Sequence, residues 1–397
     1  MENYETRQLS YAKFLSIICL IAFFCFAASY MRLPIVPLYA KSLGIDTAHI
    51  GIINSIFYLS AGTLSLPLGI LSDQLGRKRL AVSGLLLLSV SSFLLYYSET
   101  FISLSAVYLV YGFGMALFGP TMMSMVADFS PSTHLGRSYG WYTTAFYCGI
   151  SLGPALGGFI GKNFGFIQVF FVSGIFLLLN IFITLIFLPG PPAAVAASHS
   201  KTKIISTIKK DILGNRPLIG CWIATLAGTF GLGTFITFVP LHAQNQGLKL
   251  DQIGIVFFVQ GIVNALSRIP LGYLTDKAGD RKNLVVLGLI GFSISVAGFG
   301  ISIKIDHFMI CAMALGFSMA MAFTSIGALI AETVPPESRG LAMGGYNSII
   351  YFSMMICSAL MGYIIQRAGF NKGLSIAGII IFVLIAFFYY LIKERTT

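Results

Sequence analysis

Apolar stretches of similar length recur along almost the whole chain, separated by short polar segments. A helix that crosses a lipid bilayer needs about 20 mostly apolar residues, and twelve stretches come close to or exceed this length. They lie near residues 14–39, 50–71, 80–97, 101–126, 139–161, 166–188, 217–241, 253–272, 284–303, 307–331, 341–365 and 373–392. Backbone groups in lipid must hydrogen-bond within their own segment, so the pattern predicts twelve transmembrane helices.

The polar segments between these stretches repeat halfway along the chain. Gly69–Arg79 joins the second and third stretches, and the similar Gly272–Lys282 joins the eighth and ninth. The first glycines of these segments are 203 residues apart in a chain of 397, and Asp128 and Glu332, after the fourth and tenth stretches, are 204 apart. Two independent motifs are thus repeated at nearly the same distance along the chain. This indicates two halves that run in the same direction through the membrane, as in many secondary transporters.

The repeat also predicts the domain organisation. Residues 1–188 and 217–397 each contain six stretches, and residues 189–216 form the only long connection between stretches. This connection begins with Pro and Gly, which end helices, and becomes basic, as expected for a cytoplasmic linker. We therefore expect an all-α membrane protein with twelve transmembrane helices in two pseudo-symmetric six-helix bundles.

Composition and charge agree with a membrane protein. The chain is 56% hydrophobic and 10% charged, with a mean hydropathy of +0.86, whereas soluble domains contain about 25% charged residues. The net charge of +11 does not indicate nucleic-acid binding, because the basic residues lie in short loops. With the N-terminus in the cytoplasm, seventeen of the twenty-five Lys and Arg lie inside, which predicts a multi-pass protein of the inner or plasma membrane with both termini cytoplasmic.

The sequence contains no pattern that is typical of an enzyme. The six cysteines are scattered through apolar stretches without metal-ligand or CxxC spacing. We find neither a nucleophile–base arrangement nor a phosphate-binding loop. The expected partners are therefore the lipid bilayer and a small-molecule substrate, and no cofactor, metal or nucleic acid is expected.

The repeated loops predict a gate on the cytoplasmic side. Gly69 and Gly76 allow a tight turn and close packing, and the carboxylate of Asp73 can face the positive end of a neighbouring helix. Arg77 and Arg137 can join Asp73 and Asp128 in an ion network that breaks when this side opens. The alternative is that these charges only anchor the loops in water. The predicted gate residues are Gly69, Asp73, Gly76, Arg77, Lys78, Asp128, Arg137, Gly272, Asp276, Glu332 and Arg339.

The fifth stretch contains a second candidate motif, made of glycines around a proline. Gly149, Gly153 and Gly157 are spaced by four, so they share one helix face that another backbone can approach closely. Pro154 frees a backbone carbonyl and favours a bend, and Gly158 completes the pattern. A bend beside a glycine face can serve as a hinge between bundles, although glycine-rich faces are also ordinary in membrane helices.

Together these residues resemble the major facilitator superfamily along the whole chain. The loop Gly69–Arg79 is similar to the signature G-x-L-a-D-r-x-G-R-K of that superfamily, and its second copy is looser because the arginine is shifted to Arg281. Gly149–Gly158 is similar to the motif G-x-x-x-G-P-x-x-G-G of the drug–proton antiporters. The resemblance implies two six-helix bundles around a central cavity, alternating access by rocking, export of substrate and a monomeric protein.

Two departures from the antiporter pattern leave the coupling ion open. Drug exporters of this branch carry an arginine early in the fourth span, whereas Tyr108–Gly114 contains no basic residue. None of the fourteen acidic residues lies in the middle of a predicted span. The candidates for coupling are therefore Asp73, Asp128 and Glu332, or a cationic site that binds an anionic substrate.

Two arginines lie within the predicted spans. Arg32 is about 28 Å along the helix from Lys13, and a charge inside the bilayer is by default a functional hypothesis. Its guanidinium would suit a carboxylate, phosphate or sulfonate, or it extends to the outer interface. Arg268 lies one turn before Gly272, and we expect it to bond nearby carbonyls or Asp276, or to extend to the cytoplasmic interface.

Other polar side chains within the spans occur in pairs on single helix faces. Each pair can line a substrate cavity, and each can equally make hydrogen bonds between helices. These further substrate-binding candidates are Asn54 and Tyr58, Tyr108 and Tyr111, Gln260 and Asn264, and Asn347 and Tyr351.

The expected function is export of small amphipathic or lipophilic molecules, with the proton as the coupling ion. One alternative is an exchanger of organic anions, such as carboxylates or phosphates, that uses Arg32. Another is a transport-inactive membrane receptor built on the same fold.

Overall fold

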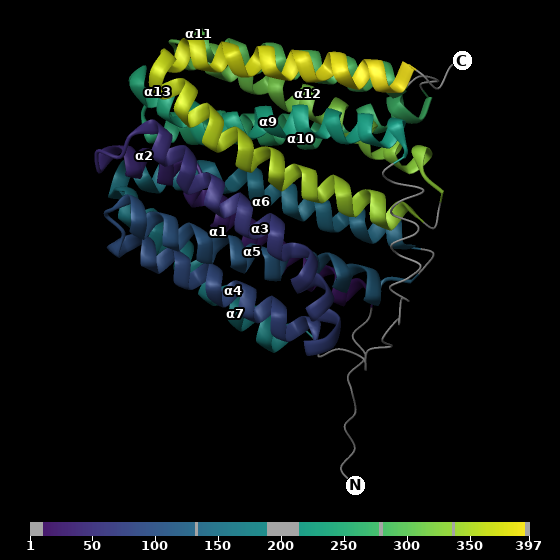
Figure 1. The fold of residues 1–397 in the computed structure, drawn as a ribbon. Coiled ribbons are helices and arrows are strands. Elements are labelled where there is room, and N and C mark those ends of the chain that lie inside the picture. Colours follow the sequence, from purple (N-terminus) through teal and green to yellow (C-terminus); the bar gives the residue numbers. More distant parts are fainter. Residues whose placement is uncertain (1–10, 132–133, 189–213, 278–280, 336–337, 394–397) are drawn as a thin grey trace.

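The computed structural model describes residues 11–131, 134–188, 214–277, 281–335 and 338–393, and these are helical along most of their length (Figure 1). The side chains of Asp73, Asp276 and Arg339 lie outside the described part. Most of the predicted linker, residues 189–213, also lies outside it.

The first half of the chain forms six long helices and two short ones. Apolar residues bury the inner faces of these helices against one another. The elements are α1 (Tyr11–Arg32), α2 (Ile35–Ser42), α3 (Thr47–Leu75), α4 (Arg77–Leu94), the 3₁₀ turn η1 (Leu95–Tyr97), α5 (Phe101–Phe129), α6 (Leu135–Phe164) and α7 (Phe166–Phe187).

The second half repeats this order. Its elements are α9 (Arg216–Asn245), α10 (Leu250–Lys277), α11 (Arg281–Ile301), α12 (Ile305–Thr333) and α13 (Arg339–Lys393). Inside α13, Gly369 is non-helical, with φ 80° and ψ 167°, so α13 consists of two helices that meet at this glycine. A positive φ of this kind is easy only for glycine. The described helices therefore agree with the two sets of six spans that the sequence predicts.

The first predicted span is one helix in the sequence pattern but two in the structure. The helix α1 ends at Arg32, and α2 begins after Pro34. Proline has no backbone N–H and cannot continue the hydrogen-bond ladder of a helix. The amide of Leu33 instead donates to the carbonyl oxygen of Tyr30 (3.2 Å), which closes a tight turn between the two helices.

The helices form two bundles that lie side by side in Figure 1, with α1–α7 below and α9–α13 above. The bundles meet along two long seams, one between α3 and the first part of α13 and the other between α6 and α10. Large apolar side chains cover the outside, for example Ile269, which is 83% exposed, and Ile186, which is 71% exposed. Such surfaces suit lipid rather than water.

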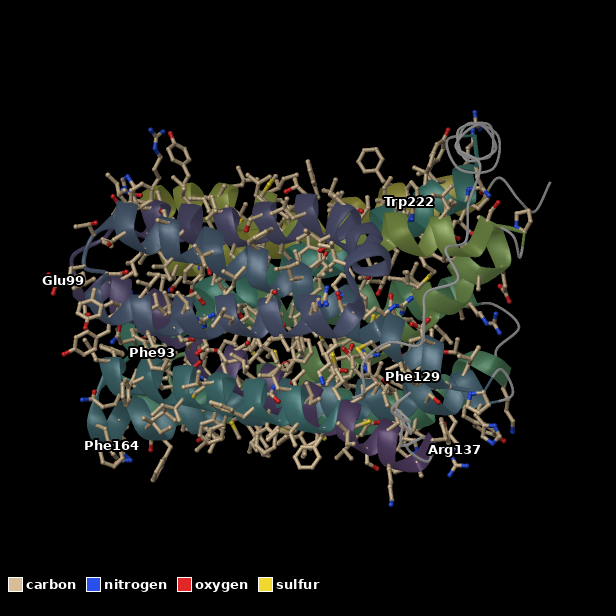
Figure 2. All side chains as sticks on the ribbon, turned by 90° about the horizontal axis from the view of Figure 1, so that it is seen from below. Phe93, Glu99, Phe129, Arg137, Phe164 and Trp222 are labelled. Carbon is tan, nitrogen blue, oxygen red and sulfur yellow. The ribbon has the colours of Figure 1, made fainter. Side chains whose placement is uncertain are left out.

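The two ends of the molecule carry different residues. Figure 2 shows Glu99 and Phe164 at one end and Arg137 at the other. We call these the Glu99 end and the Arg137 end. By length and composition, ten helical segments of the described chain can cross a membrane, with α1–α2 and α13 each counted as one.

Candidate functional site

The seam between α6 and α10 brings two glycines into direct contact across the bundles. A methyl group added at Gly158 of α6 would collide with the carbonyl oxygen of Leu250 and would lie 3.1 Å from Cα of Gly254 on α10. A methyl group at Gly254 would lie 2.5 Å from the carbonyl oxygen of Pro154. The two backbones are so close here that only glycine, which has no side-chain carbon, fits at either position.

The other seam contains an equivalent contact. A methyl group at Gly51 of α3 would collide with the carbonyl oxygen of Ser358 and would lie 3.2 Å from Cα of Gly362 on α13. Gly51 precedes Gly254 by 203 residues and Gly158 precedes Gly362 by 204, the same offsets as in the repeated loops. We call the pairs Gly158–Gly254 and Gly51–Gly362 the two glycine crossings. Gly158 is among the residues predicted from the sequence, whereas its partner Gly254 and the second pair are not.

The other three glycines of the predicted antiporter motif contact a different helix. Added methyl groups at Gly149 and Gly153 would lie 2.7 Å and 2.5 Å from carbonyl oxygens of α1, and one at Gly157 would collide with the carbonyl oxygen of Met31. The helix α6 thus contacts α1 of its own bundle with one face, and α10 of the other bundle with the face that carries Pro154 and Gly158.

Polar contacts join the two bundles at the Glu99 end. Lys162 at the end of α6 forms an ion pair with Asp251 at the start of α10, with 2.7 Å between Nζ and Oδ2. Lys41 donates to the side chain of Asn245. On the other seam, the amide of Ala48 donates to Oε1 of Gln366 (3.1 Å).

Removing one of these contacts should favour opening of the Glu99 end. Lys162 and Asp251 are 41% and 25% exposed, and partly exposed ion pairs contribute about 0.2–1 kcal/mol. In Lys162→Gln, we expect a cysteine introduced at Gln260 to react about two- to fivefold faster with a membrane-impermeant maleimide. High salt should produce a similar increase in the wild-type chain but not in Lys162→Gln. Equal rates in both proteins at low salt would show that the ion pair does not hold this end.

An apolar groove of about 570 Å³ lies on the surface of the α3–α13 seam. Its lining includes Leu59, Met355 and Tyr363. At its base Ser55 donates to the carbonyl oxygen of Met355 (2.8 Å), a hydrogen bond that crosses the two bundles. The groove is open to the outside of the helices, where a membrane would supply lipid.

Arg268 connects the bundles on the α6–α10 seam. Its Nη2 donates to the hydroxyl of Tyr147 on α6 (2.6 Å), and the guanidinium lies over that ring at 4.1 Å from its centre. Its Nε donates to Oδ1 of Asn264, one turn away on α10 (2.8 Å). The expected bond to a nearby carbonyl oxygen is thus made to the side chain of Asn264, and the expected alternative, Asp276, has its side chain outside the described part. The contact with the other bundle was not predicted. Gln260, one further turn away, donates to the sulfur of Met319 (3.4 Å).

Arg32 is sequestered inside the first bundle. It is 1% exposed, so it does not extend to the outer interface. Nη1 donates to Ser92 (2.8 Å) and Nη2 to Ser91 (3.1 Å), both on α4. The guanidinium also lies 3.8 Å from the centre of the Tyr111 ring on α5. Hydroxyl groups and an aromatic face thus replace water around this charge.

The remaining predicted substrate-binding residues lie in different surroundings. Tyr58 and Tyr108 are buried, and Asn54 donates weakly to a carbonyl of its own helix (3.5 Å). Tyr351 contacts Gly62 across the α3–α13 seam, whereas Asn347, one turn earlier, is exposed. Tyr58, Tyr108 and Tyr111 are nevertheless brought together, because all three rings contact Phe57, and Tyr111 also lies beside Arg32. Part of the predicted set therefore forms one aromatic cluster.

At the Arg137 end, an ion pair ties the first repeated loop to the end of α5. Nη1 of Arg77 lies 2.6 Å from Oδ2 of Asp128. Arg137 itself is exposed, and its predicted part in this network is not seen among the described contacts. The predicted contributions of the Asp73, Asp276 and Arg339 side chains lie outside the described residues.

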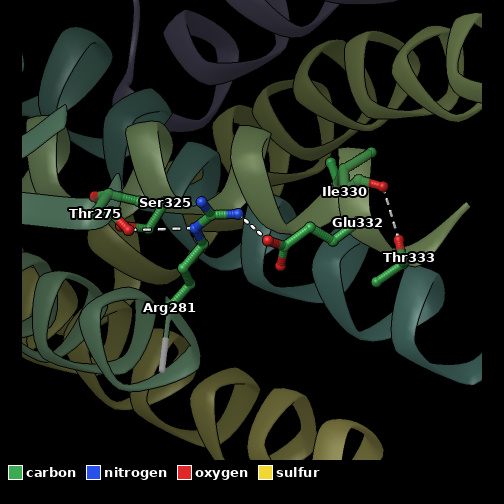
Figure 3. A network of polar contacts seen from close by, with 6 residues as sticks. All are labelled: Thr275, Arg281, Ser325, Ile330, Glu332 and Thr333. Atoms are coloured by element: carbon green, nitrogen blue, oxygen red, sulfur yellow. Dashed lines mark hydrogen bonds and ion pairs between the residues drawn. The ribbon is translucent and has the colours of Figure 1, made fainter. Parts of the chain in front are cut away.

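The second repeat contains the same ion pair, formed by Arg281 and Glu332 (Figure 3). Nε of Arg281 also donates to the carbonyl oxygen of Thr275 (3.2 Å), and the hydroxyl of Thr275 bonds that of Ser325 (3.1 Å). Arg281 follows Arg77 by 204 residues, as Glu332 follows Asp128. The shifted arginine of the looser loop therefore makes the equivalent contact. Arg281 is not among the predicted gate residues, although its offset of 204 from Arg77 could have identified it.

Reversal of one charge in this pair should weaken the second bundle slightly. Glu332 is 50% exposed, so we expect Glu332→Lys to lower the melting temperature in detergent by roughly 1–2 °C. The double variant Arg281→Glu with Glu332→Lys should recover most of this loss. An equal loss in the single and double variants would contradict the pairing.

These features define a class of protein. The sequence profile of the Major Facilitator Superfamily matches residues 18–251 and 221–397, which together span most of the chain. The chain belongs to this superfamily of membrane transporters.

Similar proteins include a quinolone resistance protein. The chain is 26% identical over 374 residues to the quinolone resistance protein NorA of Staphylococcus aureus, covering 90% of this chain and 93% of NorA. It is 25% identical over 341 residues to an uncharacterized MFS-type transporter of Methanocaldococcus jannaschii, covering 85% and 87% of the two chains.

Solved structures share the fold. The nucleoside transporter NupG matches with a TM-score of 0.79 at 17% identity, covering 96% of this chain and 99% of that one. A bacterial homolog of the human lysosomal transporter Spinster, in an inward-facing and occupied conformation, matches with a TM-score of 0.77 at 14% identity and 96% coverage of both chains. At these identities the likeness concerns the fold alone.

Proposed function

We propose that this transporter exports small amphipathic or lipophilic molecules across the cell membrane in exchange for protons. The observation that carries the proposal is the position of the glycine–proline segment of α6. It contacts α1 through Gly149 and Gly153, and α10 through Pro154 and Gly158. A segment of the antiporter type thus lies where the two bundles would move against each other. The similarity to NorA, a quinolone resistance protein, also favours export.

Transport would proceed by rocking of the two bundles, residues 1–188 and 217–397, joined by the linker 189–216. The ion pair Lys162–Asp251 and both glycine crossings hold the bundles together toward the Glu99 end. The basic loops favour placing the Arg137 end in the cytoplasm. This arrangement supports a state that is closed to the outside and accepts substrate from the cytoplasmic side. The monomer contains both bundles and is the proposed unit of transport.

Proton coupling in this proposal uses carboxylates at the helix ends. Asp128 and Glu332 each pair with an arginine of the repeated loops. Protonation of either carboxylate would remove the attraction and loosen its loop. The alternative of an anion exchanger that uses Arg32 is not favoured, because Arg32 bonds Ser91 and Ser92 within its own bundle.

Proteoliposomes with a pH-sensitive dye inside would test the proposal. An inside-acid gradient would be imposed, and lipophilic cations, neutral compounds and organic anions would be added separately. We expect substrate-dependent proton movement that is lost in Asp128→Asn. Lys304→Gln, at the start of α12 outside the ion pairs, is the matched control and should keep wild-type rates. Substrate uptake without proton movement would contradict antiport, and no uptake of any class would contradict export.

A further inference from the structure

We propose that Arg268 is a substrate-binding residue that binds an anionic group, such as a carboxylate, on an amphipathic substrate. This inference rests on the proposed export function and adds a substrate class to it. It differs from the expectation for Arg32 in the residue, the bundle and the surface involved. Three observations carry it: the Arg268 donors that have no acceptor among the described residues, the lack of an acidic partner within that part of the chain, and its place on a seam.

The first observation is the hydrogen-bond inventory of the guanidinium. Arginine has five N–H donors in a planar fork. Arg268 uses Nε for Asn264 and one Nη2 hydrogen for Tyr147. Among the described residues no acceptor lies on Nη1, so the edge formed by Nη1 and the second Nη2 hydrogen is available. Such an edge matches the two oxygens of a carboxylate.

The second observation is the missing countercharge. The described contacts of Arg268 are all with uncharged groups, a phenol and an amide. A charge inside a membrane protein is costly unless it is paired or faces a water-filled space. Unlike Arg32, which is 1% exposed, Arg268 is only partly buried, so an incoming anion can reach it. An anionic substrate would supply the countercharge that the described residues do not provide at this position.

The third observation is the location of Arg268 where three helices approach. It lies on α10, contacts Tyr147 on α6 and is close enough to Tyr346 on α13 to interact with it electrostatically. An anion at Arg268 would therefore lie beside aromatic rings of both bundles, which can contact the apolar part of an amphipathic molecule. Binding at a seam would also change the contact that links α6 to α10.

Binding of three matched aromatic probes to the purified full chain would test the inference. The probes are radiolabelled 2-naphthoate, 2-naphthamide and a naphthylmethyl-trimethylammonium cation, which share one ring system. We expect Arg268→Gln to weaken naphthoate binding by about 10- to 100-fold, with little change for the neutral and cationic probes. Arg268→Lys should retain part of the affinity. Arg367→Gln is the matched control, because Arg367 lies 4.3 Å over the Tyr363 ring on the exposed surface.

A second variant separates ligand binding from a purely structural bridge. Tyr147→Phe removes the hydroxyl that accepts from Nη2 but keeps the ring. If Arg268 binds the anion, naphthoate affinity should be retained or increased, since a donor becomes free. If Arg268 serves only to join α6 and α10, Tyr147→Phe and Arg268→Gln should weaken all three probes together. That result would overturn the inference, as would wild-type naphthoate affinity in Arg268→Gln.

Failure of the anion site at Arg268 can be distinguished from failure of the proposed export function. A wild-type protein that transports the cation but does not bind naphthoate overturns the role of Arg268 and leaves export intact. A wild-type protein that binds naphthoate through Arg268 but transports no probe overturns export and leaves the anion site intact.

Discussion

Leucine at Gly158 is expected to abolish transport while the protein remains folded. A methyl group at this position already collides with the carbonyl oxygen of Leu250 across the α6–α10 seam, and a larger side chain would push the two backbones apart. Strain of about 3 kcal/mol in the closed seam would lower the population of that state by about 100-fold. The bundles themselves do not need this contact, because the face of α6 that contacts α1 is unchanged.

Transport in proteoliposomes and maleimide labelling would measure this effect together. We expect at least a 100-fold loss of transport and faster labelling of a cysteine at Gln260 from the Glu99 end. Gly140→Leu is the control on the same helix, since a methyl group at Gly140 has no neighbour within 4 Å. Gly362→Leu should reproduce the loss at the second glycine crossing. Normal transport by Gly158→Leu would show that this seam does not close during the cycle.

Alanine at Gly157, one residue away, is expected to act on stability instead. Its methyl group would collide with the carbonyl oxygen of Met31 and lie 2.9 Å from the carbonyl carbon. The helices α1 and α6 belong to one bundle, and in the proposed rocking motion this contact stays closed in both states. We therefore expect a loss of about 2–3 kcal/mol in the free energy of unfolding and less folded protein in the membrane.

Thermal unfolding in detergent, with Gly140→Ala as the control, would measure this second effect. Gly157 faces α1 of the same bundle and Gly158 faces α10 of the other bundle, so the two variants separate stability from transport. Gly157→Ala should lower the melting temperature, whereas Gly158→Leu should leave it close to the wild-type value. A stable Gly157→Ala that fails only in transport would mean that α1 and α6 also move apart during the cycle.

The positions of the apolar spans could be predicted from the sequence because lipid imposes a simple rule. An apolar stretch of sufficient length must be helical, and glycine, proline and charged residues mark its ends. The predicted span 166–188, for example, is α7, Phe166–Phe187. The break after Arg32 does not follow from the length of the apolar stretch, because Pro34 continues that stretch while it ends the hydrogen-bond ladder of the helix.

The direction of individual side chains could not be predicted in the same way. The depth of Arg32 in the membrane follows from counting residues, but its partners follow from which helices lie beside α1. Only the fold places Ser91 and Tyr111 there. The same limit applies to Arg268, whose partner Tyr147 is 121 residues away. The glycine crossings were detectable in principle, since their offsets equal those of the loops.

The burial of Arg32 has a consequence for the energetics of the cell membrane. The charge is fixed within its bundle by hydroxyl groups and a ring, and no described acidic side chain contacts it. If that bundle tilts during transport, the charge moves through part of the membrane voltage, which acts with about 2.3 kcal/mol per charge per 100 mV for a full crossing. Voltage would then shift the balance between the two states of the protein even when the transported molecule is neutral.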